Sequence, residues 1–177
     1  MIKINIVPVK FPNNILLSKI QKKLESVLKS KINFINFNLE LGKFYSEERG
    51  QYFSTQILSE VIKLTPENKD NLMILTGVDL YVPVLTYIFG EAQLKGKYSI
   101  ISVRRLHEEF YTGESNDELL FERTIKEILH ELGHNFGLLH CLDWDCVMHA
   151  SNDVEEVDIK GSFYCKSCYE SIALLKS

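Results

Sequence analysis

Apolar and polar positions along the first hundred residues follow two different periods. Apolar residues that recur every three or four positions predict two amphipathic helices, over residues 14–29 and 51–64. Alternation of period two, or a short unbroken apolar run, predicts strands over residues 2–8, 32–41, 71–76, 87–92 and 98–103. Strands and helices therefore alternate, which favours an α/β fold with a sheet covered by helices.

The chain beyond residue 110 holds a third predicted helix and then little periodicity. Ser115 and Glu118 have the spacing of a capping box, and the helical pattern after them continues to about Phe136. After Gly137, the sequence predicts only a short helix over residues 168–175. We therefore expect a region of sheet and helices followed by a small irregular region.

The candidate functional residues and the apolar residues of this third helix lie on different sides of it. At about 100° per residue from His130, His134 lies near ~40° and Glu131 near ~100°. The apolar residues lie between about 160° and 260° on the same wheel: Phe121, Ile125, Ile128, Leu129, Leu132 and Phe136. We expect the apolar face to pack inward and the two histidines to face the other way, with Glu131 beside them.

The same helix contains HELGH, residues 130–134. Two imidazoles one helical turn apart can hold one zinc ion, and a carboxylate next to the first can take a proton from water on that ion. His130 and His134 are thus candidate ligands, and Glu131 is a candidate general base. The alternative is that a five-residue pattern has occurred by chance on a solvated helix face.

A third histidine, His140, follows His134 by six residues, with Gly137 between them. A straight helix would place His140 roughly 240° around from His134, so the helix must end if both are to bind one metal. Glycine adopts positive φ without steric cost and is common just past a helix end. Three imidazoles would leave an open fourth position, as a catalytic zinc requires. The alternative is an ordinary helix end with an unrelated His140.

Length and composition restrict the classes of protein. A chain of 177 residues is the size of one domain. No segment approaches the length of an apolar membrane span, and a net charge of −4 without a dense basic run argues against nucleic acid as a partner. The N-terminus lacks the pattern of a secretory signal, so we expect a cytoplasmic protein. In a reducing cytosol, four cysteines favour metal thiolates over disulfides.

The motif HExxHxxGxxH followed by Met148 resembles that of the metzincin clan of zinc peptidases, and Met148 stands where that clan has its Met-turn. Cys141, Cys146 and the later pair in CKSC look like those of the archaemetzincin family. The segment GVDLYVPVLTYIFGEA, residues 77–92, is also similar to that family. The loop from Met148 to Cys165 is slightly shorter than the family's usual spacing.

The resemblance implies a metzincin-like α/β fold in one catalytic domain, residues 1–177. Residues 1–137 would form an upper lobe with a twisted mixed sheet and helices, ending in the active-site helix. Residues 138–177 would form a small irregular lower lobe with the Met-turn, and the active-site cleft would lie between the two. The resemblance also implies two zinc ions, one catalytic on three histidines and one structural on four cysteines.

The four cysteines can be considered on their own chemistry as well. A CxxC pair is a tight chelating unit, so Cys165 and Cys168 with Cys141 and Cys146 can supply a closed tetrahedral site, which has a structural role. Two disulfides are the alternative, with three possible pairings. A third possibility is that Cys141 occupies the fourth position of the catalytic zinc as an inhibitory thiolate.

We therefore predict a zinc metallopeptidase that hydrolyses peptide bonds with Glu131 as general base. The peptide or protein substrate would lie extended along an edge strand near residues 87–92. The rival hypothesis is a zinc-stabilised protein-interaction module with a vestigial three-histidine site. We expect a monomer. We interpret His107 as a polar surface or packing histidine, His149 as a surface histidine beside the turn, and the acidic pairs Glu108–Glu109 and Glu155–Glu156 as solvated faces.

Overall fold

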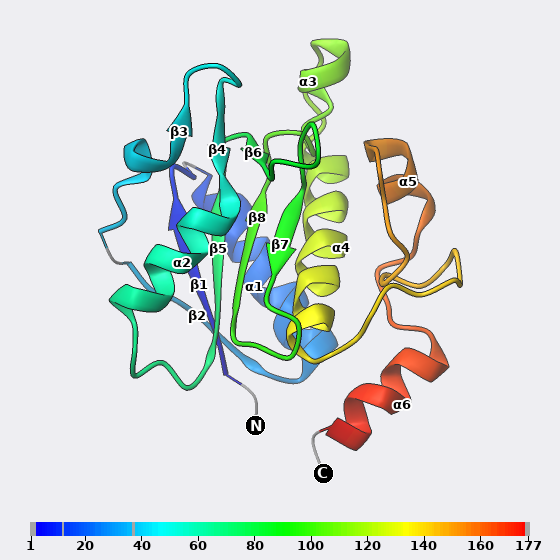
Figure 1. Ribbon diagram of the computed structural model, residues 1–177. Coiled ribbons are helices and arrows are strands. Elements are labelled where there is room, and N and C mark those ends of the chain that lie inside the picture. The colour runs from blue at the N-terminus through cyan, green and yellow to red at the C-terminus, as the bar shows by residue number, and fades with distance from the viewer. Residues whose placement is uncertain (1–2, 12, 37, 176–177) are drawn as a thin grey trace.

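A computed structural model describes residues 3–11, 13–36 and 38–175 of the chain. Within these residues a five-stranded sheet has the order β2-β1-β5-β8-β7 (Figure 1). Its first four strands in that order are mutually parallel, and β7 is the antiparallel edge strand. The bounds are β1 (Lys3–Val9), β2 (Lys31–Phe34), β5 (Asn71–Thr76), β7 (Gly90–Ala92) and β8 (Tyr98–Ser102). The predicted α/β class with a mixed sheet is confirmed; Ile2 of the first predicted strand lies outside the described residues.

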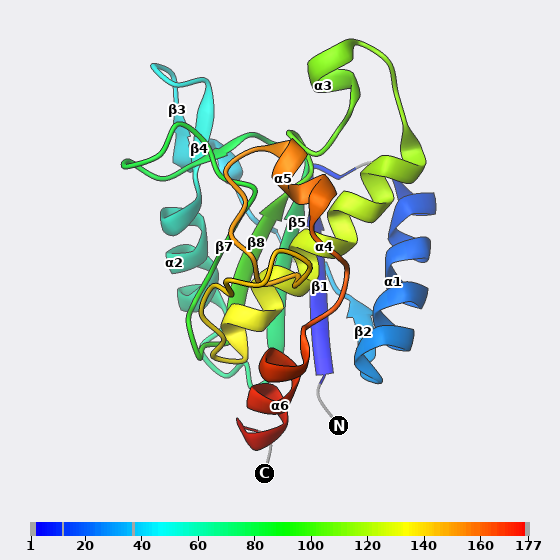
Figure 2. The same cartoon turned by 90° about the vertical axis from the view of Figure 1, so that its right-hand side faces the viewer.

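Helices cover both faces of this sheet. Helices α1 (Asn14–Leu28) and α4 (Asp117–Asn135) pack on one face, and α2 (Ser54–Leu64) packs on the other (Figures 1 and 2). Helix α1 begins after Asn13, whose side chain accepts a hydrogen bond from the Leu16 amide at 2.9 Å. Strand β5 lies between the two layers and is buried along its whole length, as its unbroken apolar run predicts.

Two predicted elements in the first half are partly wrong. The predicted strand over 32–41 ends at Phe34, and the chain reaches a 3₁₀ helix, η1 (Leu41–Phe44), through irregular structure; residue 37 lies outside the described residues. The helix predicted over 51–64 begins only at Ser54. The residues before it form β4 in a second sheet of order β3-β4-β6, namely Tyr45–Ser46, Gln51–Phe53 and Leu80–Tyr81.

The strand predicted over 87–92 is shorter than expected. Only Gly90–Ala92 pairs continuously with β8, whereas Ile88 forms an isolated bridge with Leu80. The strand predicted over 98–103 ends one residue early, at Ser102. Period-two alternation therefore located this edge of the sheet and overestimated the length of its ladder.

Helix α4 does not begin with the predicted capping box. Asn116 is the N-cap, and its side chain accepts from the Leu119 amide at 3.0 Å. The helix ends at Asn135, one residue before the predicted end. A short helix that the sequence pattern did not predict, α3 (Glu109–Thr112), precedes it.

The C-terminal segment, residues 138–175, contains more helix than expected. Helix α6 (Lys166–Leu175) starts two residues before its predicted position, and α5 (Val154–Ile159) was not predicted. Helix α5 begins at Asp153, whose side chain accepts from the Glu156 amide at 2.9 Å. Six residues carry too few apolar positions to reveal a period, so this helix gave no sequence signal.

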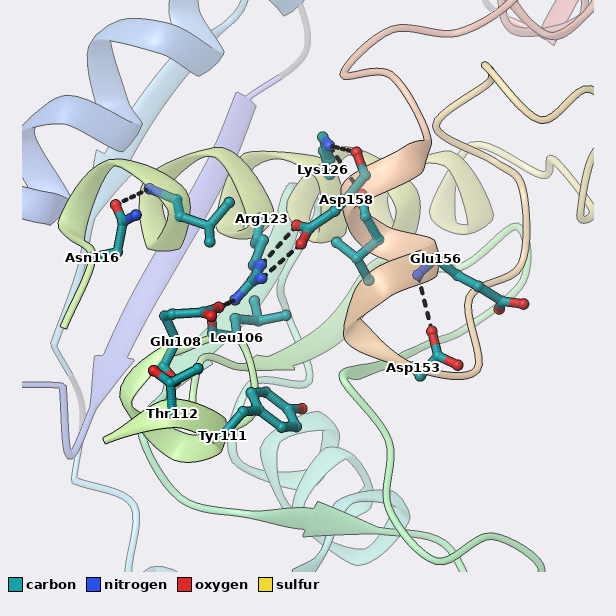
Figure 3. A network of polar contacts seen from close by, with 12 residues as sticks. Leu106, Glu108, Tyr111, Thr112, Asn116, Arg123, Lys126, Asp153, Glu156 and Asp158 are labelled. Atoms are coloured by element: carbon teal, nitrogen blue, oxygen red, sulfur yellow. Dashed lines mark hydrogen bonds and ion pairs between the residues drawn. The ribbon is translucent and has the colours of Figure 1, made fainter. Parts of the chain in front are cut away.

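Helix α5 is attached to α4 by a buried arginine (Figure 3). The Arg123 guanidinium donates to both carboxylate oxygens of Asp158 at 2.7 and 2.6 Å, to the Leu106 carbonyl at 3.0 Å, and pairs with Glu108 at 2.9 Å. The interpretation of Glu108 as part of a solvated face was therefore wrong. A bidentate guanidinium fixes orientation as well as distance, so α5 is held in one position along α4.

No helix among the residues that the structure describes is long and apolar enough to cross a membrane.

Candidate metal centre and active-site cleft

Helix α4 places His130 and His134 on the side away from its apolar face, as the helical wheel predicts, and Glu131 lies between the two, against Gly90 of β7. That side is nevertheless covered, because His130 is 6% and Glu131 5% exposed. The C-terminal segment covers His130: its Nδ1 lies 2.8 Å from the Val147 carbonyl, and the Tyr164 hydroxyl donates to the neighbouring Leu129 carbonyl at 2.6 Å. Glu131 is covered by Gly90 of β7. The helical wheel correctly separated the two histidines from the apolar face of α4. It could not show that other parts of the chain pack over the histidines.

A tight turn after α4 brings His140 back to the helix. Gly137 has φ of +95°, its amide donates to the His134 carbonyl, and the Leu138 amide donates to the Gly133 carbonyl, both at 2.9 Å. This is the Schellman arrangement, which satisfies the last carbonyls of a helix and favours glycine at the left-handed position. The predicted turn at Gly137 is confirmed.

The three histidine rings converge as a result. Ring centroids lie 4.7 Å apart for His130 and His134, 5.3 Å for His130 and His140, and 5.0 Å for His134 and His140. The Nδ1 atoms of His130 and His134 lie 2.8 Å from the carbonyls of Val147 and Leu138. Because a carbonyl only accepts, each Nδ1 carries the proton and each Nε2 is left with a free lone pair.

The arrangement fits a tetrahedral zinc ion. One potential ligand atom from each histidine lies within 4.8 Å of the others, and the Nε2 atoms of His130 and His134 are 3.1 Å apart. Two nitrogens on a tetrahedral zinc ion at ordinary bond lengths are separated by about 3.3 Å. The closest pair therefore has nearly the spacing that one shared ion requires.

The protonation states suit metal binding as well. Burial lowers the pKa of His130 to about 4 and also lowers the pKa of His140, so both imidazoles are neutral at pH 7. Burial raises the pKa of Glu131 well above its ordinary value, and the neighbouring Glu127 carboxylate raises it further. A carboxyl group with a raised pKa is a stronger base than an exposed one.

The four cysteines form a second cluster. Their sulfur atoms all lie within 4.8 Å of one another, and the Sγ atoms of Cys141 and Cys165 are 3.8 Å apart. Two thiolates on a tetrahedral zinc ion are separated by about 3.8 Å. All four cysteines are free rather than paired in disulfides, and the set fits a closed four-sulfur zinc site. The four are Cys141, Cys146, Cys165 and Cys168.

Adjacent residues thus belong to different clusters. His140 lies with the histidines and Cys141 with the cysteines, so the inhibitory role considered for Cys141 does not match its place. The Cys141 amide donates to the Met148 carbonyl at 2.9 Å, and the His149 amide donates to the Cys146 carbonyl at 2.9 Å. His149 is half-buried beside the turn: its ring lies against the exposed Trp144 with centroids 4.1 Å apart, and its Nδ1 lies 3.0 Å from the Cys141 carbonyl.

Met148 is fully buried and packs directly against α4 at Gly133. A β-carbon at Gly133 would overlap the Met148 sulfur and lie 3.0 Å from its terminal carbon. The glycine of HELGH is therefore required by the packing of Met148.

We expect Gly133→Ala to lower the free energy of unfolding by about 1–3 kcal/mol, because an added methyl group in a close-packed site forces a shift of backbone or side chain. Thermal or urea unfolding of the zinc-loaded protein measures this. Gly42→Ala is the matched control, since a β-carbon at Gly42 has no neighbour within 4 Å. Equal stability of the two variants would contradict the packing argument.

An open cleft of about 520 Å³ lies against the histidine cluster. One side is formed by the segment that contains β7, and the other by the C-terminal segment through Leu139, His140 and residues 150–152. Three charged residues that the sequence did not single out also line it: Glu91, Glu127 and Lys160. Only Glu127 had a possible signal, since it precedes Glu131 by one helical turn.

Helix α4 carries two histidines and a glutamate, the third histidine follows a glycine turn, and a buried methionine packs against the same helix. This combination defines the metzincin class of zinc peptidase. Comparison with known proteins identifies the family within that class. The family model described as Peptidase family M54 matches residues 12–174. The chain belongs to this family, the archaemetzincins.

Individual relatives agree with this assignment. The archaemetzincin of Thermococcus kodakarensis is 52% identical over 94 residues, which are 53% of this chain and span 50% of that relative. The crystal structure of archaemetzincin from Methanopyrus kandleri has a TM-score of 0.86 at 31% identity, over 99% of this chain and 95% of that one. A zinc-dependent peptidase from Methanocorpusculum labreanum gives 0.85 at 26% identity, over 96% and 99%.

Proposed function

We propose that this protein hydrolyses peptide bonds, with zinc held by His130, His134 and His140 and with Glu131 as general base. The observation that carries the proposal is the convergence of three imidazole nitrogens beside a buried carboxylate in an open cleft. When bound there, zinc supplies a Lewis acid, which acidifies water and polarises a carbonyl.

The residues of the chain supply binding, orientation and proton transfer. The hydrogen bonds from His130 and His134 to backbone carbonyls keep both rings in one tautomer and orientation. The Glu131 carboxylate accepts a proton from the attacking water and then passes it to the departing amine of the substrate. Its burial keeps bulk water from competing for that proton.

The substrate is expected to bind as an added strand along β7. This strand pairs with β8 on one side only, and its residues line the cleft. An extended peptide can then use the free backbone groups of β7. Gly90 brings this strand beside the base, because a β-carbon there would lie 2.7 Å from Oε1 of Glu131. A substitution at Gly90 would displace Glu131, so it cannot test strand pairing alone.

We assign a second, structural zinc to Cys141, Cys146, Cys165 and Cys168. Four thiolates close the coordination shell, which leaves no position for water or substrate. We also propose that residues 1–177 act as one catalytic domain, with lobes 1–137 and 138–177 on either side of the cleft. Support comes from the cleft lining, to which both parts contribute.

Metal analysis together with a peptide assay tests the proposal. We expect two zinc ions per purified chain, and we expect His134→Ala to retain one of them and to lose peptide cleavage. A chelator that strips the histidine site should abolish cleavage, and added zinc should restore it. Fewer than two zinc ions, or cleavage that persists after chelation, would contradict the assignment. Two zinc ions with no cleavage of any peptide in a random library would favour the interaction module.

A further inference from the structure

A buried ion pair borders the active-site cleft, and neither of its residues is assigned to zinc binding or to proton transfer. The Nζ atom of Lys160 lies 2.8 Å from Oε1 of Glu127, and their side chains are 1% and 4% exposed. Both residues line the cleft together with His130 and Glu131. The pair therefore lies beside the proposed reaction and away from the core of the sheet.

A buried ion pair of this kind is not explained by stability alone. Removing two charges from water costs several kcal/mol per ion, and apolar residues of similar volume are often as stable or more stable. Ser151, also at the cleft, adds a buried hydroxyl oxygen without a hydrogen-bond partner among the described residues. Polar groups are thus buried at this site, although their burial costs free energy of folding.

Three charged side chains of α4 fix the position of Lys160. Arg123 holds Asp158 of α5, and Lys126 donates to the carbonyls of Val157 and Asp158, both at 2.9 Å (Figure 3). Lys160 follows directly after α5, so its backbone lies beside the next turn of α4. Glu127 is the residue of α4 that receives its ammonium group.

From that position Lys160 reaches the turn that contains Met148. Its ammonium group donates to the His149 carbonyl at 3.4 Å. Two residues earlier, the Val147 carbonyl accepts from Nδ1 of His130 at 2.8 Å. The short segment Val147–His149 is thus held from one end by a candidate zinc ligand and from the other by the ion pair.

We propose that Lys160, paired with Glu127, is a positioning residue for His130. By holding the His149 carbonyl it fixes the turn, and through the Val147 carbonyl the turn fixes the orientation of the His130 imidazole. The role rests on the proposed function of the histidine site as a zinc site. Loss of the pair should weaken zinc binding and lower kcat, and it should leave KM close to its wild-type value, because strand β7, on which the substrate is proposed to bind, is not altered.

The test replaces the ion pair with apolar residues of similar size, Glu127→Leu/Lys160→Met. A single substitution would leave one charge buried without a partner and destabilise the fold, whereas the double variant avoids this. We expect a thermal midpoint close to that of the wild type and zinc affinity at the histidine site about 10- to 100-fold weaker. Competition with a zinc indicator measures the affinity on protein whose cysteine site is filled, and kcat is measured at saturating zinc.

Lys126→Met is the matched control, because Lys126 also joins α4 to α5, through hydrogen bonds to the carbonyls of Val157 and Asp158. It should keep wild-type zinc affinity. Lys160→Arg keeps the charge and should keep more of the zinc affinity than Glu127→Leu/Lys160→Met does.

Three outcomes would overturn the proposal. The first is a folded double variant with wild-type zinc affinity and kcat, and the second is an equal loss in Lys126→Met, which would assign the effect to the docking of α5. The third is a double variant that does not fold, which would show that the ion pair is required for folding. Zinc affinity is measured without substrate, so a failure to find any peptidase activity leaves this test intact and overturns only the proposed function.

Discussion

Glu131→Gln is expected to leave both zinc ions in place and to lower kcat by about 10²- to 10⁴-fold, the usual contribution of a general acid–base group. Glutamine has nearly the same size as glutamate, so the buried site should not collapse. It cannot accept a proton from water, and it is not one of the three residues that converge on the proposed metal. Peptide cleavage under saturating substrate, together with zinc content, measures both halves of this expectation.

Glu122→Gln is the matched control for that experiment, since Glu122 is an exposed glutamate on the same helix. It should have wild-type kcat. If Glu131→Gln kept wild-type activity, another group would have to transfer the proton, and the assignment of the general base would fail. If Glu131→Gln lost its zinc as well, the fall in activity would report on metal binding instead.

Cys165→Ser is expected to remove the second zinc and to destabilise the C-terminal segment strongly. Structural zinc in small domains supplies about 10–16 kcal/mol of apparent binding free energy, much of which becomes folding free energy. We also expect weaker zinc binding at the histidines, because Cys141 follows His140 directly and its amide is bonded to the Met148 carbonyl. Zinc content, thermal unfolding and zinc affinity of the remaining site measure the three effects.

Ser167→Ala, between the two cysteines of CKSC, is the control because its side chain is exposed and is not part of the sulfur cluster. It should behave as the wild type in all three measurements. A Cys165→Ser protein with one zinc lost and an unchanged affinity at the histidine site would show that the neighbouring clusters are independent. Retention of both zinc ions would contradict the assignment of the second zinc to the four cysteines.

Long elements with a clear period could be predicted from the sequence. Helix α1 and strand β5 agree with their predicted ranges almost residue for residue, because each buries an unbroken apolar pattern. The small sheet could not be predicted. Its strands have two or three residues each, too few to establish alternation, and the pairing of Gln51–Phe53 with Leu80–Tyr81 depends on contacts distant in sequence.

The two candidate ligand clusters could also be predicted from the sequence, for a different reason. Ligand spacing within a helix turn, across a glycine and within CxxC is set by local geometry, so residues such as His130, His134 and Cys168 can be grouped from their positions along the chain. The charged pair at the cleft could not be found in this way. Lys160 lies in a segment without periodicity, and its partnership with Glu127 exists only because α5 docks on α4.

All seven residues of the two clusters lie between positions 130 and 168, and the sheet supplies none of them. During synthesis on the ribosome, the last strand of the large sheet, which ends at Ser102, therefore emerges well before either set of ligands is complete. The ligands then meet over short sequence separations, for which the entropy cost of loop closure is small and formation is fast. Metal loading is thus expected as a late and local event in biogenesis, on a scaffold that has already left the exit tunnel.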